Sequence, residues 1–148
     1  MQRLALRALL PVVLMTAALA AVAGEYGTPE EAKAMLEKAV AALKADKDQA
    51  LEMFTKGEGG FKQGDLYPYC GGPDGNFTAH PKLVGESLKD LKDKTGNPFG
   101  QEIYEKAQEG EVAEVPYMWP RPGEEEPVQK VAYVTKVDDQ VCAVGYYK

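Results

Sequence analysis

The chain has 148 residues, with 17 Lys and Arg against 23 Asp and Glu, one His and two Cys. A net charge near −6 without clustered Lys and Arg excludes the basic footprint of a nucleic-acid-binding protein. This length suits one ordinary domain and is too short for two.

The first 23 residues have the pattern of a secretory signal peptide. Arg3 and Arg7 precede an apolar run over residues 8–21, and Ala21-Val22-Ala23 ends just before Gly24. We predict cleavage after Ala23, which leaves residues 24–148 as one periplasmic or secreted domain with a net charge near −8. The apolar run is shorter than the roughly 20 residues that a membrane span needs. Retention of the segment as an anchor is the alternative.

Two cysteines, Cys70 and Cys142, would enter an oxidising compartment with this domain. Disulfides form and persist in such compartments, so one bridge is the simplest interpretation. Two buried free thiols remain the alternative, because free Cys is itself among the most buried residue types.

The first predicted element is a long helix. Thr28-Pro29-Glu30-Glu31 has the form of a capping box with Pro at the first helical position. Apolar residues at three-and-four spacing continue to Phe54, with a bend expected near 46–48. Such a helix would reach roughly 40 Å, enough to cover one face of a sheet and still contact a partner.

A β-hairpin is predicted next, from strands over 65–70 and 76–80 around the turn residues Pro73-Asp74-Gly75. Pro68 cannot donate to a strand ladder, so one side of this position should be unpaired or bulged. Short helices and turns follow. The clearest helix begins at Pro98, with Asn97 as its cap, and ends at Gly110.

Three strands are predicted in the last third of the chain, over 112–119, 128–137 and 141–147. Polar turns separate them, which indicates a meander. The order of helix, hairpin, helical crossing and meander predicts an α+β domain with one antiparallel sheet.

Enzyme and metal functions find little support. The chain has neither a serine-elbow motif nor a phosphate loop, and Ser87 is its only serine. The single histidine, His80, has no second His at zinc-site spacing, so a structural hydrogen bond or a ligand contact suits it better. Asp93, Thr95 and Asn97 could form part of a calcium loop, but no Glu follows at the EF-hand distance. We therefore predict no catalytic residue, no cofactor and no metal site.

Several short motifs, taken in order, carry a family resemblance. They are Asp65-Leu66-Tyr67, Asp74-Gly75, Ala79-His80-Pro81, Gly85, Tyr117-Met118-Trp119-Pro120, Lys130 to Tyr133 and Val144-Gly145-Tyr146. Over residues 28–148 the chain resembles the single Cache domains of bacterial extracytoplasmic sensors. The resemblance implies a PAS-like, five-stranded antiparallel sheet with the long N-terminal helix on one face. Short helices and a small-molecule pocket would cover the other face. It also makes the first and last strands neighbours, which would place Cys70 beside Cys142.

The same resemblance nominates seven pocket residues: Tyr67, Tyr69, His80, Tyr117, Trp119, Lys130 and Tyr133. Aromatic rings would form an apolar wall with hydroxyl and indole donors, and Lys or His would bind a carboxylate. The structural alternative is that these aromatics are simply core.

The resulting functional hypothesis is an exported, non-enzymatic Cache domain that binds a short carboxylate or an amino acid. It would report to a membrane-bound receptor or kinase, with the long helix mediating partner contact or a homodimer. The alternative is an envelope structural or interaction module with a collapsed pocket. A solvent-facing Lys130, with no cavity bordering Trp119, would favour that alternative.

Overall fold

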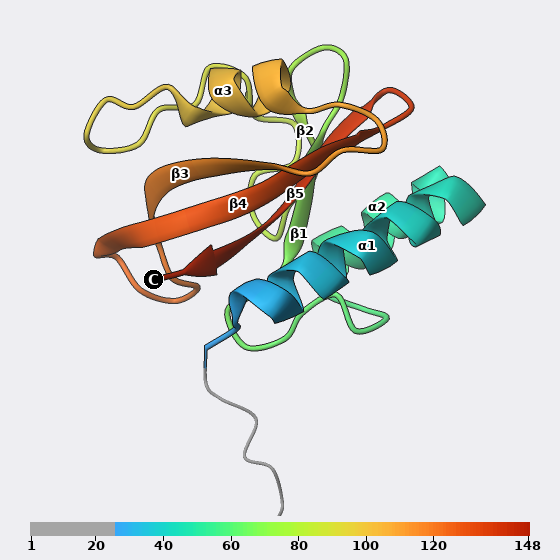
Figure 1. Cartoon of the computed structure of the whole chain (residues 1–148), viewed down its shortest axis with the longest axis horizontal. Helices are drawn as coiled ribbons and strands as arrows, with labels where there is room; N and C mark the ends of the chain where they lie inside the picture. Colours follow the sequence, from blue (N-terminus) through green and yellow to red (C-terminus); the bar gives the residue numbers. More distant parts are fainter. Residues whose placement is uncertain (1–25) are drawn as a thin grey trace, which may run out of the picture.

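The computed structural model describes residues 26–148 and shows helices packed on both faces of one five-stranded sheet (Figure 1). The predicted signal peptide and its cleavage site lie outside the described residues. In chain order the elements are α1 (Pro29–Ala45), α2 (Lys47–Lys56), β1 (Pro68–Gly71), β2 (Phe77–Ala79), α3 (Phe99–Lys106), β3 (Ala113–Pro120), β4 (Pro127–Val137) and β5 (Gln140–Tyr147). The predicted α+β class is confirmed.

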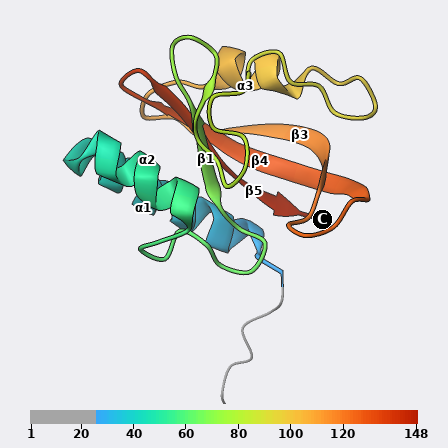
Figure 2. The same ribbon diagram turned by 180° about the vertical axis from the view of Figure 1, so that it is seen from behind.

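The N-terminal helical region starts where the sequence predicts but divides into two helices. The Thr28 hydroxyl accepts from the Glu31 N–H, and Glu31 accepts from the Thr28 N–H, which confirms the capping box. Asp46 has extended backbone angles, ends α1 and caps α2 by accepting from the Gln49 N–H. The expected single bent helix is therefore a helical hairpin, with α2 running back along α1 (Figures 1 and 2). Helix α1 alone is only about 25 Å long.

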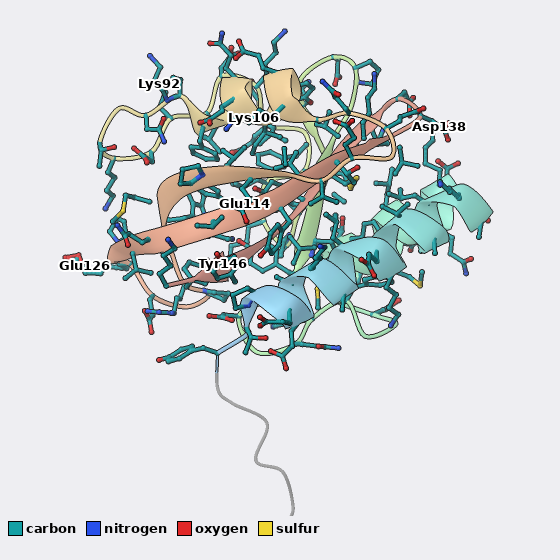
Figure 3. The ribbon with its side chains drawn as sticks, in the orientation of Figure 1. Lys92, Lys106, Glu114, Glu126, Asp138 and Tyr146 are labelled. Atoms are coloured by element: carbon teal, nitrogen blue, oxygen red, sulfur yellow. A yellow bond between two sulfur atoms is a disulfide. The ribbon has the colours of Figure 1, made fainter. Side chains whose placement is uncertain are left out.

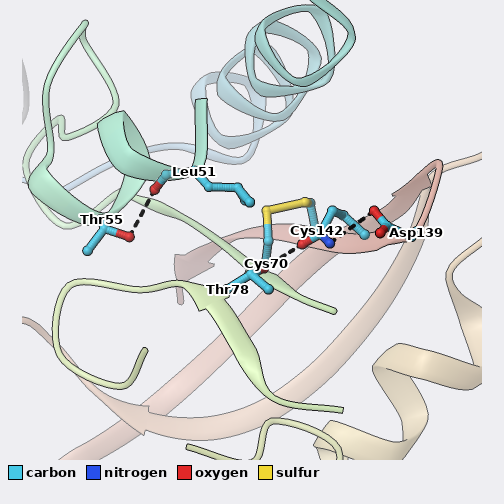
Figure 4. Close-up of a disulfide and its surroundings, with 7 residues drawn as sticks. Leu51, Thr55, Cys70, Thr78, Asp139 and Cys142 are labelled. Carbon is cyan, nitrogen blue, oxygen red and sulfur yellow. Dashed lines mark hydrogen bonds between the residues drawn. A yellow bond between two sulfur atoms is a disulfide. The ribbon is translucent and has the colours of Figure 1, made fainter. Parts of the chain in front are cut away.

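All strand pairs in the sheet are antiparallel, in the order β2-β1-β5-β4-β3. The predicted meander is β3-β4-β5, and β1 pairs with β5 as the Cache resemblance implies. Cys70 lies directly opposite Cys142 in this pairing, and the two form a disulfide. Figure 4 shows the bond on the face of the sheet that α1 and α2 cover, beneath α2. Pro68 pairs only toward β5, so its other side is unpaired as expected.

The two faces of the sheet bury separate clusters. One cluster joins α1 and α2 to the side chains of Cys142 and Val144 on β5. The other joins α3 and the preceding loops to alternate residues of the same strands, such as Val134 and Ala143. Because successive side chains of a strand point to opposite faces, residue parity decides which cluster each one enters.

The free edge of β3 is covered by the loop before α3. Asp93 accepts from the Met118 N–H at 2.9 Å, and the Asn97 amide donates to the Pro116 carbonyl at 3.2 Å. The prediction that Asn97 caps α3 is wrong, because Pro98 occupies the cap position and the Asn97 side chain is used at β3. These contacts fix β3 beside the loop that forms part of the candidate site.

Candidate functional site

Lys130 is the central residue of the α3-side face. It is only 1% exposed, and its ammonium donates to the Tyr67 hydroxyl at 3.1 Å. The rings of Tyr67, Tyr147, Tyr69 and Tyr117 surround Nζ, with centroids 4.4, 4.8, 5.7 and 5.9 Å away. Cation–π attraction offsets part of the desolvation of this charge. No salt bridge within residues 26–148 includes Lys130.

Gly145 on β5 makes room for the Lys130 side chain. A Cβ at this position would lie 2.3 Å from Lys130 Cε, far inside van der Waals contact. The cross-strand glycine therefore allows the stem of Lys130 to lie flat on the sheet, with its ammonium among the tyrosines. This gives a physical reason for the Gly in Val144-Gly145-Tyr146.

The tyrosines around Lys130 are held in fixed positions. Tyr69 and Tyr117 share a hydrogen bond of 2.9 Å between their hydroxyls, and burial raises the pKa of both well above its ordinary range. Phe99 of α3 stacks on Tyr117 with ring centroids 4.0 Å apart and meets Trp119 edge-on. The wall is thus a set of neutral hydroxyls on a rigid aromatic frame.

His80 lies in the same wall as a neutral donor. Its Nδ1 accepts the backbone N–H groups of Lys82 at 3.0 Å and Leu83 at 3.2 Å, which places the ring proton on Nε2. Burial, with the charges of Lys130 and Lys82, lowers the pKa of His80 to about 3. His80 is therefore an uncharged Nε2–H donor throughout the physiological pH range.

Two spaces share the aromatic wall of this cluster. The inner cavity has a volume of about 10 Å³, room for about one water molecule, and is lined by Tyr67, Tyr69, Phe77, His80, Leu91, Phe99, Tyr117 and Trp119. The outer groove has a volume of about 330 Å³ and lies among segments 81–83, 92–94 and 118–124. Tyr67, His80 and Trp119 line both, so the groove and the inner cavity share a wall. Lys130 lines neither space, because its ammonium lies behind the tyrosine rings of this wall. It lines a separate space of about 220 Å³ together with Asp93, Tyr117 and Met118.

Six of the seven residues nominated from the sequence lie together at this site. Tyr133 does not. It is an odd number of positions from Lys130 on β4, so its side chain points to the opposite face of the sheet, toward α1. There its ring centroid lies 5.6 Å from that of Tyr146. Figure 3 shows Tyr146 on the side of the sheet that faces α1. Sequence reasoning missed Tyr147, Phe77, Leu91 and Phe99. Tyr147 could have been found, because it is two positions from Gly145 on β5 and therefore points to the same face of the sheet. Leu91 and Phe99 reach the cavity only through tertiary packing.

The Arg121–Asp65 charged pair adjoins Tyr147, one of the rings around Lys130. The Arg121 Nε is 3.7 Å from Asp65 Oδ2, and neither atom has a hydrogen-bond partner in the described chain. Asp65 Oδ1 accepts from the Gly27 N–H at 2.8 Å. The Arg121 guanidinium stacks over Tyr26 at 4.5 Å and over Tyr147 at 5.3 Å. This pair joins the β3–β4 connection to the start of the described chain.

The family model for single Cache domain 2 matches residues 11–146. The chain belongs to this family. The solved structures agree with that assignment. A methyl-accepting chemotaxis protein from Vibrio parahaemolyticus is 25% identical, with a TM-score of 0.64 over 80% of this chain and 86% of that one. A periplasmic sensor domain of a chemotaxis protein is also 25% identical, with a TM-score of 0.60 over 80% and 88%.

A third structure addresses carboxylic acid recognition by a Cache chemosensory domain. At 24% identity and a TM-score of 0.57, over 80% of this chain and 86% of that one, it shares the Cache fold. In sequence, the chain is 36% identical over 56 residues to the methyl-accepting chemotaxis protein McpP of Pseudomonas putida. That match covers 38% of this chain and about a tenth of the length of McpP. Within residues 26–148 of this Cache domain, no helix is long and apolar enough to cross a membrane.

The single histidine permits a clean test of its depressed pKa. His80 has a folded-state pKa of about 3 against an ordinary value near 6.5, so the unfolded state binds more protons in this window. The free energy of unfolding should therefore fall as the pH drops below 6.5. Between pH 6.5 and 4.5 we expect this loss to be about 2 kcal/mol larger in the wild type than in His80→Asn.

Urea unfolding at several pH values measures this difference. Asn is the matched replacement, because its Oδ1 can accept the same Lys82 and Leu83 N–H groups while it cannot titrate. Parallel curves for the two proteins would show that His80 binds its proton as readily in the folded state as in the unfolded state, contrary to the expectation.

Proposed function

We propose that this Cache domain is an extracytoplasmic, non-enzymatic sensor module whose ligand is a short carboxylate bound through Lys130. The observation that carries the proposal is the buried ammonium without a counter-ion in the described chain. Lys130 and Arg121 supply two positive charges and Asp65 one negative charge around Tyr67 and Tyr147. One carboxylate would neutralise this cluster and use the remaining ammonium donors, which offsets the cost of burying the charge.

The lining of the inner cavity favours carboxylates without an α-ammonium group over amino acids. None of its eight lining residues is acidic, so an ammonium inside this cavity would find no carboxylate in the cavity wall. His80 presents an N–H donor, which suits a carbonyl, hydroxyl or carboxylate oxygen and opposes another donor. Its Nε2–H would therefore orient the ligand that Lys130 holds.

The features that distinguish a binding domain from a module with a collapsed pocket support binding. Lys130 is buried, and both the inner cavity and the outer groove border Trp119. The inner cavity is small, so a ligand would occupy the groove, displace an aromatic ring inward, or do both. The Cache fold shared with chemosensory domains, one of them described for carboxylic acid recognition, is consistent with this role.

Reporting to a membrane-bound receptor or kinase is part of the proposal. Tyr67 contacts Lys130, and Asp65, two residues earlier, holds Gly27 at the start of the described chain. A displacement of Tyr67 by ligand would thus act close to the N-terminal connection. A homodimer through α1 remains a prediction.

A thermal-shift screen tests the binding proposal. Protein unfolded and refolded to remove co-purified ligand would be heated with formate, acetate, propionate, pyruvate, lactate, glycine and alanine. Ligand at about 100 times its dissociation constant should add roughly 2.7 kcal/mol to the free energy of unfolding. We expect acids to stabilise the domain and amino acids to leave it unchanged. An unchanged melting temperature with every acid would contradict the proposal.

A further inference from the structure

The outer groove, rather than the inner cavity, has room for most of a ligand. Its volume of about 330 Å³ lies in the range of small-molecule sites, roughly 300–1,000 Å³, whereas the inner cavity holds about one water. A ligand whose carboxylate reaches Lys130 through the shared wall would leave the rest of its body in the groove. The chemistry of the groove therefore bears on which ligands bind.

The walls of the groove carry a local excess of positive charge. Arg121, Lys82, Lys92 and Lys94 line it, against Asp93 and Glu124. Of the two acids, Asp93 is turned toward its own loop and β3, where it accepts hydrogen bonds from Thr95, Asn97 and Met118. The three lysines form no salt bridge within the described part of the chain. This excess stands out in a chain with more acidic than basic residues.

Arg121 is the groove residue best suited to hold an anion. Its side chain is only 18% exposed, its Nε has no hydrogen-bond partner in residues 26–148, and the nearest Asp65 oxygen is 3.7 Å away. Stacking over Tyr26 and Tyr147 holds the guanidinium plane in place. A planar guanidinium fork matches carboxylate geometry, and an ionic hydrogen bond of this kind is stronger than a neutral one.

The distance between the two cations limits the size of the ligand. Lys130 Nζ is 4.8 Å and Arg121 Cζ is 5.3 Å from the centroid of the Tyr147 ring, so the two lie no more than about 10 Å apart. With about 2.8 Å for an ionic hydrogen bond at each end, this upper limit admits a ligand skeleton of at most about four carbons.

We propose that the outer groove is a second anion subsite, in which Arg121 and the lysines bind the distal carboxylate of a short dicarboxylate. The inference rests on the proposed function, because Lys130 would hold the proximal carboxylate. It narrows the ligand class from short carboxylates in general to those that carry a second acidic group.

Titration calorimetry with propionate and succinate tests the subsite. Succinate adds one carboxylate to the propionate skeleton, and we expect it to bind the wild type at least about 10-fold more tightly. Arg121→Gln should lower succinate affinity more than propionate affinity. Separately, the triple variant K82Q/K92Q/K94Q should remove most of the advantage of succinate and change propionate affinity less than about twofold. The control K33Q/K62Q/K136Q removes the same number of charges from positions that do not line the groove.

The outcomes separate the subsite from the proposed function. Equal affinities for propionate and succinate in the wild type would overturn the subsite and leave the carboxylate site intact. An equal loss of succinate affinity in the control triple would also overturn it, since the effect would then be long-range charge alone. Failure of both acids to bind would overturn the proposed function and the subsite together. If Arg121→Gln does not fold, the exposed lysines of the triple variant carry the test.

Discussion

Replacing Lys130 by Met should abolish carboxylate binding without harming the fold. Loss of a buried, hydrogen-bonded charge pair with the ligand is expected to lower affinity at least about 100-fold. The unliganded protein should become more stable by about 1 kcal/mol, because an ammonium without a carboxylate partner in residues 26–148 is replaced by an apolar chain of similar length. The loss of one hydrogen bond from Tyr67 and of the cation–π contacts limits this gain.

Opposite changes in affinity and stability distinguish a binding residue from a structural one. Calorimetry with the acid that gives the largest thermal shift, together with urea unfolding of the unliganded protein, measures both quantities. Lys136→Met on the same strand is the control, since Lys136 is exposed and should leave both unchanged. A Lys130→Met protein that binds the acid normally, or that unfolds more easily by several kcal/mol, would show that Lys130 serves the core instead.

The elements of this Cache domain follow from local sequence signals where caps and periodicity are strong. The capping box at Thr28 predicted the start of α1, and the polar turns between the last three strands predicted the meander. The division of the first helix was less visible, because Asp46 has to be recognised as ending one helix and capping the next. A short polar side chain that can bond a neighbouring N–H favours such a break, but the reversal of direction depends on packing against the sheet.

The candidate site was predictable in part from the Cache resemblance. Tyr67, His80 and Lys130 follow from motif order, and strand parity by itself separates Tyr133 from the face that carries Lys130. The contributions of Leu91, Phe99 and Arg121 could not be derived this way, because each comes from a loop, a short helix or a strand connection placed by tertiary contacts. Asp93 illustrates the limit: its carboxylate fixes β3 through Met118, 25 positions further along the chain.

The disulfide should supply much of the stability of the domain. Cys70 and Cys142 are almost fully buried beneath α2 and are 72 positions apart in sequence. Loop-closure entropy assigns a cross-link of this length about 4 kcal/mol, out of the roughly 5–15 kcal/mol typical of a whole domain. We expect the double variant C70A/C142A to lose about 4 kcal/mol of unfolding free energy and to melt roughly 15 °C lower.

Reduced wild-type protein is the control that separates the cross-link from packing, because it keeps both sulfur atoms. It should lose nearly as much stability as C70A/C142A, and both should show a larger urea m-value, since an unfolded chain without the cross-link exposes more surface. The disulfide lies on the face of the sheet covered by α1 and α2, and Lys130 lies on the opposite face. At temperatures where the variant is folded, its carboxylate affinity should therefore stay within about twofold of the wild-type value. A reduced protein that loses less than about 1 kcal/mol would mean that the bridge adds little beyond the β1–β5 pairing that places its two residues opposite each other.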